Sequence, residues 1–206
     1  MGTLRKLTAI CALAAIAVVA VVWPAWAALE AGHAAPAFKA QDLTGVEHTL
    51  AEYRGKFVVL EWNNPGCPFV QKHYDTGNMQ KLQQDFTKRG VVWLTVNSTN
   101  PGSSDYRAPD TQSAWNKEKN LASTAYLRDP SGSVGQLYGA KTTPHMFVLD
   151  PKGVLIYAGG IDDKRSANVA DVAGAKNFVK LALNDALAGQ PVAISAAPAY
   201  GCSVKY

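Results

Sequence analysis

A single stretch of the sequence constrains the fold most, because an apolar run, a Pro-Gly turn, a cysteine and a helical pattern follow one another closely. The run Phe57–Trp62 is typical of a buried central strand. Pro65–Gly66 turn the chain, and the pattern becomes helical from Cys67 or Pro68 to about residue 88. A strand, a turn and a helix in this order place Cys67 at the carboxyl edge of a sheet, in the first turn of a helix.

Strand and helix patterns alternate along the rest of the chain. They combine βαβ units with a terminal hairpin, which predicts one α/β domain with a central mixed β-sheet flanked by helices on both faces. We expect an N-terminal hairpin at 38–48, a helical turn at 50–53, strands at 91–97, 125–127, 146–149 and 155–158, helices at 110–121, 132–138 and 172–187, and a break at Gly77 in the helix after Cys67.

The N-terminus has the pattern of a secretory signal peptide. Arg5 and Lys6 precede the apolar run Leu7–Val22, and a small-x-small pattern ends at Ala27. The run is shorter than the ~20 apolar residues that a spanning helix needs, which argues against an uncleaved membrane anchor. We therefore expect a signal peptide over 1–27, a domain over 28–189 and a C-terminal tail over 190–206, in a periplasmic or secreted protein without stable membrane insertion.

Charge and cysteine content narrow the function further. Cleavage would remove two basic residues and no acidic one, which lowers the formal net charge from +4 to +2. This bias is too weak to indicate binding to nucleic acid or to anionic membranes. Cys11 would leave with the signal peptide, so Cys67 and Cys202 would remain. In an exported chain these two cysteines indicate one disulfide or one reactive pair.

The position of Cys67 favours a reactive thiol. Unpaired backbone N–H groups and the helix dipole at a helix N-terminus favour an anion, and such sites lower the pKa of cysteine below ~8.5. Pro68 supports this helix start, because proline is preferred at the first helical position. The alternative is a buried inert cysteine, which the polar residues Asn63 and Asn64 before the turn do not favour.

Several short motifs, in order along residues 32–206, resemble the thioredoxin superfamily, and especially the peroxiredoxin-like redoxins of the alkyl hydroperoxide reductase/thiol-specific antioxidant group. The motifs are Ala35-Pro36-x-Phe38 with Asp42-Leu43-x-Gly45, Tyr53-Arg54-Gly55-Lys56, Cys67-Pro68-Phe69-Val70 with Lys72-His73, Asp129-Pro130-Ser131-Gly132, Thr142-Thr143-Pro144, and Tyr200-Gly201-Cys202-Ser203-Val204-Lys205-Tyr206. The resemblance implies a thioredoxin-like fold with Cys67 as the nucleophile.

The resemblance also implies roles for residues around Cys67. Pro144 would form a cis peptide bond that places the Thr143 backbone against the sulfur, where an extended partner chain can pair. With Asn64 and Pro68, these residues are the candidate substrate-binding set. An ordinary trans proline at the start of a strand is the alternative for Pro144.

Glu61 occupies the position of a buried acid that shuttles protons in thioredoxins. On an alternating strand it faces the same side as Phe57 and Val59, and burial would raise its pKa toward neutrality. A carboxylate satisfied by local hydrogen bonds is the alternative.

The chain departs from the family pattern in ways that bear on the reaction. Val70 stands where thioredoxins carry a second cysteine, and Asn64 where some members of the subgroup do, so no C-x-x-C motif exists. Typical peroxiredoxins also have a Thr or Ser at the position of Asn64 and an arginine in the pocket. Arg128 and Lys141 are candidates to replace that arginine, and the sequence does not place either side chain.

Cys202 is the candidate partner of Cys67. The residues between Gly189 and Cys202 reach up to ~43 Å when extended, enough to cross the domain. In one interpretation Cys202 resolves a sulfenic acid or mixed disulfide on Cys67. In the other, a permanent Cys67–Cys202 disulfide stabilises the fold by up to ~5 kcal/mol. A tail with few signs of packing favours the first, and pairing between two copies is left open.

A metal site was considered because exported thioredoxin-fold proteins can carry copper. Cys67, His73 and His145 would supply three ligands, but their spacing is not usual for such a site, and we expect no metal or cofactor. Lys72, His73 and His145 could instead add positive potential near the sulfur.

The sequence thus predicts an exported thiol-dependent oxidoreductase. The leading interpretation is peroxiredoxin-like antioxidant activity through Cys67, resolved by Cys202. The alternatives are a protein thiol–disulfide oxidoreductase of the cell envelope and a non-catalytic module with a structural disulfide. The expected partners are a peroxide or a disulfide-bearing substrate and an unidentified thiol reductant, and the sequence leaves the oligomeric state open.

Overall fold

The computed structural model describes residues 29–206. The predicted signal peptide, its cleavage after Ala27 and Cys11 lie outside the described residues. Within 29–206, every helix is too short or too polar to cross a membrane.

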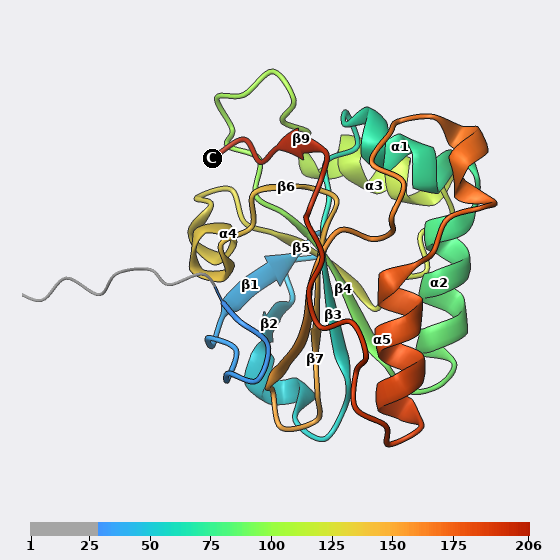
Figure 1. Cartoon of the computed structure of the whole chain (residues 1–206). Coiled ribbons are helices and arrows are strands. Elements are labelled where there is room, and N and C mark those ends of the chain that lie inside the picture. Colours follow the sequence, from blue (N-terminus) through green and yellow to red (C-terminus); the bar gives the residue numbers. More distant parts are fainter. Residues whose placement is uncertain (1–28) are drawn as a thin grey trace, which may run out of the picture.

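A seven-stranded mixed sheet, with strand order β2-β1-β5-β4-β3-β7-β8, forms the centre of the fold (Figure 1). Strand β3 pairs parallel with β4, and β4 pairs parallel with β5, while β7 pairs antiparallel with β3 and β8. The carboxyl ends of β3, β4 and β5 therefore meet at one edge. The strands are β1 (Lys39–Asp42), β2 (Glu47–Thr49), β3 (Val58–Trp62), β4 (Val92–Asn97), β5 (Ala125–Arg128), β7 (His145–Leu149) and β8 (Leu155–Gly159).

Helices cover both faces of the sheet, which confirms the predicted α/β arrangement. One apolar cluster includes residues of α1, α2, α3 and α5, and a second, on the other face, includes residues of α4 and of the 3-10 helix η1. The helices are α1 (Pro68–Asp75), α2 (Asn78–Thr87), α3 (Pro109–Glu118), α4 (Ser133–Tyr138) and α5 (Phe178–Leu187), with 3-10 helices η1 (Leu50–Tyr53) and η2 (Val169–Val172).

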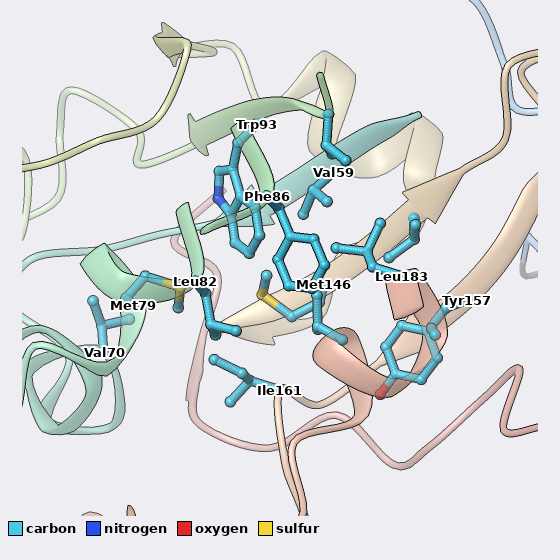
Figure 2. Close-up of a cluster of buried hydrophobic side chains, with 14 of the residues drawn as sticks. Val59, Val70, Met79, Leu82, Phe86, Trp93, Met146, Tyr157, Ile161 and Leu183 are labelled. Atoms are coloured by element: carbon cyan, nitrogen blue, oxygen red, sulfur yellow. The ribbon is translucent and has the colours of Figure 1, made fainter. Parts of the chain in front are cut away.

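Strand β3 alternates between the two apolar clusters, as its pattern of fully buried residues requires. Leu60 and Trp62 join the cluster under α4, whereas Val59 joins the cluster under α1, α2 and α5. Figure 2 shows the cluster under α1, α2 and α5, in which Val59 and Trp93 of the sheet point toward helix side chains. The turn after β3 is therefore held by a strand with no exposed residue.

Two helix boundaries show what the pattern predicted and what it missed. Gly77 adopts a left-handed conformation with φ +71° and separates α1 from α2, so the predicted break is confirmed. The predicted start of the last helix at residue 172 is wrong, because α5 begins at Phe178. Asn177 stops the helix from extending further back, since its side chain accepts the Lys180 N–H at 2.8 Å as an N-cap.

The C-terminal segment is packed against the domain, so the expectation of a tail with few contacts is wrong. After α5 it runs back to the edge of the sheet where α1 begins (Figure 1). Ala196 forms a parallel bridge with Ala158 of β8. Strand β9 (Cys202–Ser203) then pairs antiparallel with β6 (Thr142–Thr143). Cys202 is thus fixed in register instead of tethered loosely.

Candidate functional site

Cys67 lies at the N-cap of α1, as the strand–turn–helix pattern predicted. Its side chain is 2% exposed, and its carbonyl accepts the N–H groups of Val70 and Gln71 in the first turn. The thiol donates to the carbonyl of Thr143 at 3.0 Å. The backbone N–H of Cys202 donates to Cys67 Sγ at 3.4 Å. The sulfur is therefore enclosed by three separate parts of the chain.

The turn before Cys67 is built by Asn64. Its side-chain oxygen accepts the Gly66 N–H at 2.8 Å, and its carbonyl accepts the Cys67 N–H at 3.0 Å. The side-chain oxygen of Asn64 therefore stabilises the turn that presents Cys67. Pro68 follows at the first position of α1 and is exposed.

The Thr143–Pro144 peptide bond is cis, as the resemblance predicted. Thr143 is 2% exposed, and within the described structure its hydroxyl is buried without a hydrogen-bond partner. The Thr143 backbone lies against Cys67 on one side and pairs with Cys202 on the other. This edge of β6 is where an extended partner chain was expected, and the protein's own strand β9 occupies it.

The two cysteines, 135 positions apart, meet at this edge as free thiols. The register Thr143↔Cys202 brings Cys202 beside Cys67. Burial, followed by the hydrogen bond and the negative charge of Cys67, raises the pKa of Cys202 to about 12. Burial and the neighbouring sulfur therefore both favour the protonated form of Cys202.

Glu61 is fully buried on the face of the sheet that α1 and α2 cover. Its carboxylate accepts hydrogen bonds from Tyr74 at 2.6 Å, Trp93 at 2.8 Å and Gln83 at 3.0 Å. Burial raises its pKa although these donors oppose the shift. The carboxylate of Glu61 is thus satisfied by hydrogen bonds, as the alternative interpretation of this residue expected. Its raised pKa is also compatible with a proton carrier.

A second group of buried polar side chains joins α1 to the C-terminal segment. No role was predicted from the sequence for two of its members, Asp162 and Tyr200. The Tyr200 hydroxyl donates to Asp162 Oδ1, and Lys72 Nζ lies 3.9 Å from Asp162 Oδ2. Lys72 also donates to the carbonyls of Lys164 and Ser166. The pair Lys72-His73 was noticed in the sequence, but nothing in its pattern names residues so distant as its partners.

The histidines do not supply positive potential to the sulfur. Burial and the Lys72 charge lower the pKa of His73 to about 3, and burial and the Lys141 charge lower the pKa of His145 to about 4. His73 lies 3.8 Å from Asp162, a distance that suits an ion pair. Its Nδ1 faces the Asn78 amide at 2.9 Å, however, and a neutral ring can accept that amide N–H. Lys72 is therefore the cation that faces Asp162.

Neither candidate for the peroxidase arginine is bonded to Cys67. Arg128 donates to the Tyr106 hydroxyl at 2.8 Å, and both line a small cavity at the ends of β4 and β5. Lys141 is exposed, and the Lys72 ammonium is bonded to backbone carbonyls. Among the described residues, no cluster of three or more metal-binding side chains is present.

The chain resembles known proteins over most of its length. The AhpC/TSA family matches residues 31–158, which contain Cys67 and Pro144 but not Cys202. The thiol-disulfide oxidoreductase ResA of Geobacillus thermodenitrificans is 29% identical over 122 residues, covering 59% of this chain and 64% of that protein. ResA of Geobacillus kaustophilus is 37% identical over 70 residues, covering 34% and 39%. The matches thus span less than two thirds of either relative.

Solved structures resemble a larger part of the chain. A hypothetical protein of Sinorhizobium meliloti superimposes with a TM-score of 0.74 at 26% identity, covering 87% of this chain and 96% of that one. An uncharacterized conserved protein of Geobacillus kaustophilus gives 0.76 at 25%, covering 86% and 93%. The thioredoxin domain of a thiol-disulfide oxidoreductase of Bacteroides vulgatus gives 0.52 at 23%, covering 71% and 97%. The fold is therefore thioredoxin-like.

Proposed function

The chain belongs to the AhpC/TSA family, and from this premise we propose that it is a thiol–disulfide oxidoreductase in which Cys67 is the nucleophile and Cys202 the resolving thiol. The observation that carries the proposal is the contact between Cys67 Sγ and the Cys202 N–H at 3.4 Å. The chain has no C-x-x-C motif, and it is the pairing of β9 with β6 that brings the two thiols together. The curated relatives named thiol-disulfide oxidoreductase support the same reaction class.

In the first step, the Cys67 thiolate attacks one sulfur of a partner disulfide. The partner's S–S bond breaks, a bond from Cys67 to one sulfur forms, and the other sulfur leaves as a thiolate that takes up a proton. Cys67 is the N-cap residue of α1, so its sulfur lies at the helix end where the helix dipole is positive.

In the second step, Cys202 loses its proton and attacks Cys67 Sγ. The mixed disulfide breaks, the partner leaves with both sulfurs reduced, and a Cys67–Cys202 disulfide remains; two electrons have passed to the partner. Burial is the largest cause of the raised pKa of Cys202, and the hydrogen bond and charge of Cys67 add to it; the mixed disulfide at Cys67 removes those two added contributions. Cys202 thus ionises more readily at the step that uses it. A thiol reductant then restores both thiols.

We place this reaction outside the cytoplasm, in the periplasm or after secretion, because residues 1–27 have the pattern of a signal peptide and Cys67 and Cys202 can pair in that environment. The substrates would be disulfide-bearing proteins of that compartment. Glu61 enters the proposal as a buried proton acceptor on β3, coupled through Tyr74 to the helix that Cys67 caps.

Peroxide reduction is a second candidate, and the match to the AhpC/TSA family supports it. The Cys67 thiolate would attack a peroxide oxygen, the O–O bond would break, and the other oxygen would leave, after taking up a proton, as water or an alcohol; Cys202 would then convert the sulfenic acid on Cys67 to the same disulfide with loss of water. It is the weaker candidate because Asn64 replaces the usual Thr or Ser and Arg128 bonds Tyr106.

Trapping of the first intermediate tests the proposal. A Cys202→Ser variant, incubated with a folded protein that contains one accessible disulfide, should accumulate a mixed disulfide at Cys67, found by peptide mass spectrometry. The matched Cys67→Ser variant should form none. Rapid sulfenic acid at Cys67 with hydrogen peroxide, and no mixed disulfide, would select peroxide reduction. No adduct with either oxidant would refute both.

A further inference from the structure

The edge of β6 next to Cys67 is occupied by the protein itself. Strand β9 is the partner of β6 in this two-stranded sheet, and it pairs through Thr142↔Ser203 and Thr143↔Cys202. The Cys202 N–H also points at Cys67 Sγ. An extended chain that approached Cys67 along this edge would need the same backbone groups, so it cannot enter while β9 is paired.

One deeply buried side chain anchors the segment 198–206. Tyr200 is 5% exposed, its ring packs edge-on against Phe69 at 5.9 Å, and Lys72 Nζ lies 5.6 Å from its ring centre. Its hydroxyl donates to Asp162, and His73 Nε2 lies 3.4 Å away. All these partners belong to the domain, and the anchor fixes the register of Cys202 two residues further on.

Glycines provide the space in which the segment lies. A Cβ on Gly201 would lie 2.0 Å from the Thr143 carbonyl oxygen, and a Cβ on Gly159 would lie 2.1 Å from the Ala197 oxygen. Real Cβ atoms do not approach so closely, so both positions require glycine. Gly160 likewise faces backbone, the Pro198 oxygen at 2.9 Å, whereas Gly132 and Gly135 face the side chain of Tyr206 at 2.5 and 2.6 Å.

Other features indicate that the segment can leave. Within 198–206, Tyr200 is the one buried residue, and the others are exposed or half-buried. The β6–β9 pairing spans two residue pairs. The docked state also leaves the buried Thr143 hydroxyl without a partner among the described residues, and such a group lowers the stability of the state that buries it.

We propose that residues 198–206 are an internal, displaceable ligand of the β6 edge, which closes Cys67 to other chains while docked and must move away before a partner's extended, cysteine-bearing segment can pair there. Tyr200 and Gly201 are positioning residues in this arrangement, because they set the register that presents Cys202 to Cys67. The inference rests on the proposed function, since it requires Cys67 to react.

Alkylation of Cys67 in the full chain tests the inference. In a Cys202→Ser background, Gly201→Val should raise the rate of Cys67 alkylation by iodoacetamide roughly 10-fold or more, because the new side chain collides with Thr143 and opens the edge. Gly189→Val is the matched control: Gly189 also has positive φ (+70°), but no atom lies within 4 Å of its added Cβ. This control should keep the slow rate.

A synthetic peptide separates gating from unfolding. A peptide of residues 197–206 with serine at 202 should slow alkylation of the Gly201→Val protein again, since it can occupy the vacated edge. Measurable and equal alkylation rates in the parent, Gly201→Val and Gly189→Val proteins would overturn the inference and leave the proposed function standing. A Cys67 that reacts in none of them, although the unfolded chain is alkylated, would instead overturn the proposed function.

Discussion

The two thiols lie in regions that differ in burial: Cys67 follows a buried central strand, and Cys202 lies on a half-buried C-terminal segment. Cys67 follows β3, in which all residues are buried and which pairs along its length with β4 and β7. Cys202 lies on a segment whose one buried residue is Tyr200, and which is otherwise held by two residue pairs of β6 and β9 and by hydrogen bonds of Val204, Lys205 and Tyr206. Cys67 is therefore part of the core, whereas Cys202 is docked on it. In the proposed reaction, a rigid attacking group and a movable resolving group would suit a partner that must enter and leave between them.

The largest expected effect concerns how much each region contributes to the free energy of unfolding. Leu60→Ala in β3 should lower the free energy of unfolding by ~2–5 kcal/mol, because it leaves a cavity at a position with no exposure. Val204→Ala, on the half-buried C-terminal segment, should cost less than ~1 kcal/mol. Urea unfolding of both variants measures the two values. Equal losses would contradict the contrast between core and docked segment.

Glu61→Gln tests the buried acid of the β3 region. In this variant an amide N–H₂ replaces one carboxylate oxygen and faces a donor, Trp93 or Tyr74, so one buried hydrogen bond is lost. The free energy of unfolding should therefore fall by ~1–3 kcal/mol. Burial raises the Glu61 pKa, so its contribution to stability is present at low pH and is lost as pH rises from about 4.5 toward the folded pKa. The loss in Glu61→Gln should therefore be largest at acidic pH.

The same variant separates the two roles of Glu61. A proton carrier predicts a changed pH profile for the second exchange step, with the rate of mixed-disulfide formation kept. An unchanged pH profile in a folded Glu61→Gln protein would leave Glu61 with a structural role alone.

The pH dependence of stability should also report on His73, the buried histidine that lies against Tyr200 of the docked segment. The pKa of His73 is lowered to about 3, so below its usual value near 6.5 the unfolded chain binds a proton that the folded chain refuses. Stability should fall as pH drops from about 6.5, by up to ~1.4 kcal/mol per pH unit for this group. His73→Gln should make the slope shallower in urea unfolding at several pH values. A slope that stays unchanged would mean that His73 is protonated in the folded state.

The smallest expected effect is that of Tyr200→Phe. Loss of the hydroxyl bond to Asp162 should cost ~0.5–2 kcal/mol of docking, while the ring keeps its contact with Phe69. Formation of the Cys67–Cys202 disulfide should slow, and alkylation of reduced Cys67 should speed up by a similar factor. Tyr157→Phe, which removes another buried tyrosine hydroxyl on the same face, is the matched control and should leave both rates unchanged.

The contrast also explains what the sequence could predict. The unit from Phe57 to α1 depends on neighbouring residues, so an apolar run, a Pro-Gly turn and a helical pattern were sufficient to place Cys67 and to break the helix at Gly77. The docking of Cys202 depends on Tyr200 meeting Asp162 and on Gly201 fitting beneath Thr143. No local pattern encodes those contacts. The predicted start of α5 was wrong for a different reason: its N-cap, Asn177, bonds Lys180 only three residues on, so the signal for the true start is local and present in the sequence.

The place of β9 in the chain has a consequence for synthesis. A ribosome makes residues from the N-terminus onward, and domains tend to form as they emerge. All seven strands of the sheet and the helix that Cys67 caps are complete before Tyr200 is made. A chain that ended before Tyr200 could therefore form the seven-stranded sheet and α1, but it would leave Cys67 without the segment 198–206 that covers it.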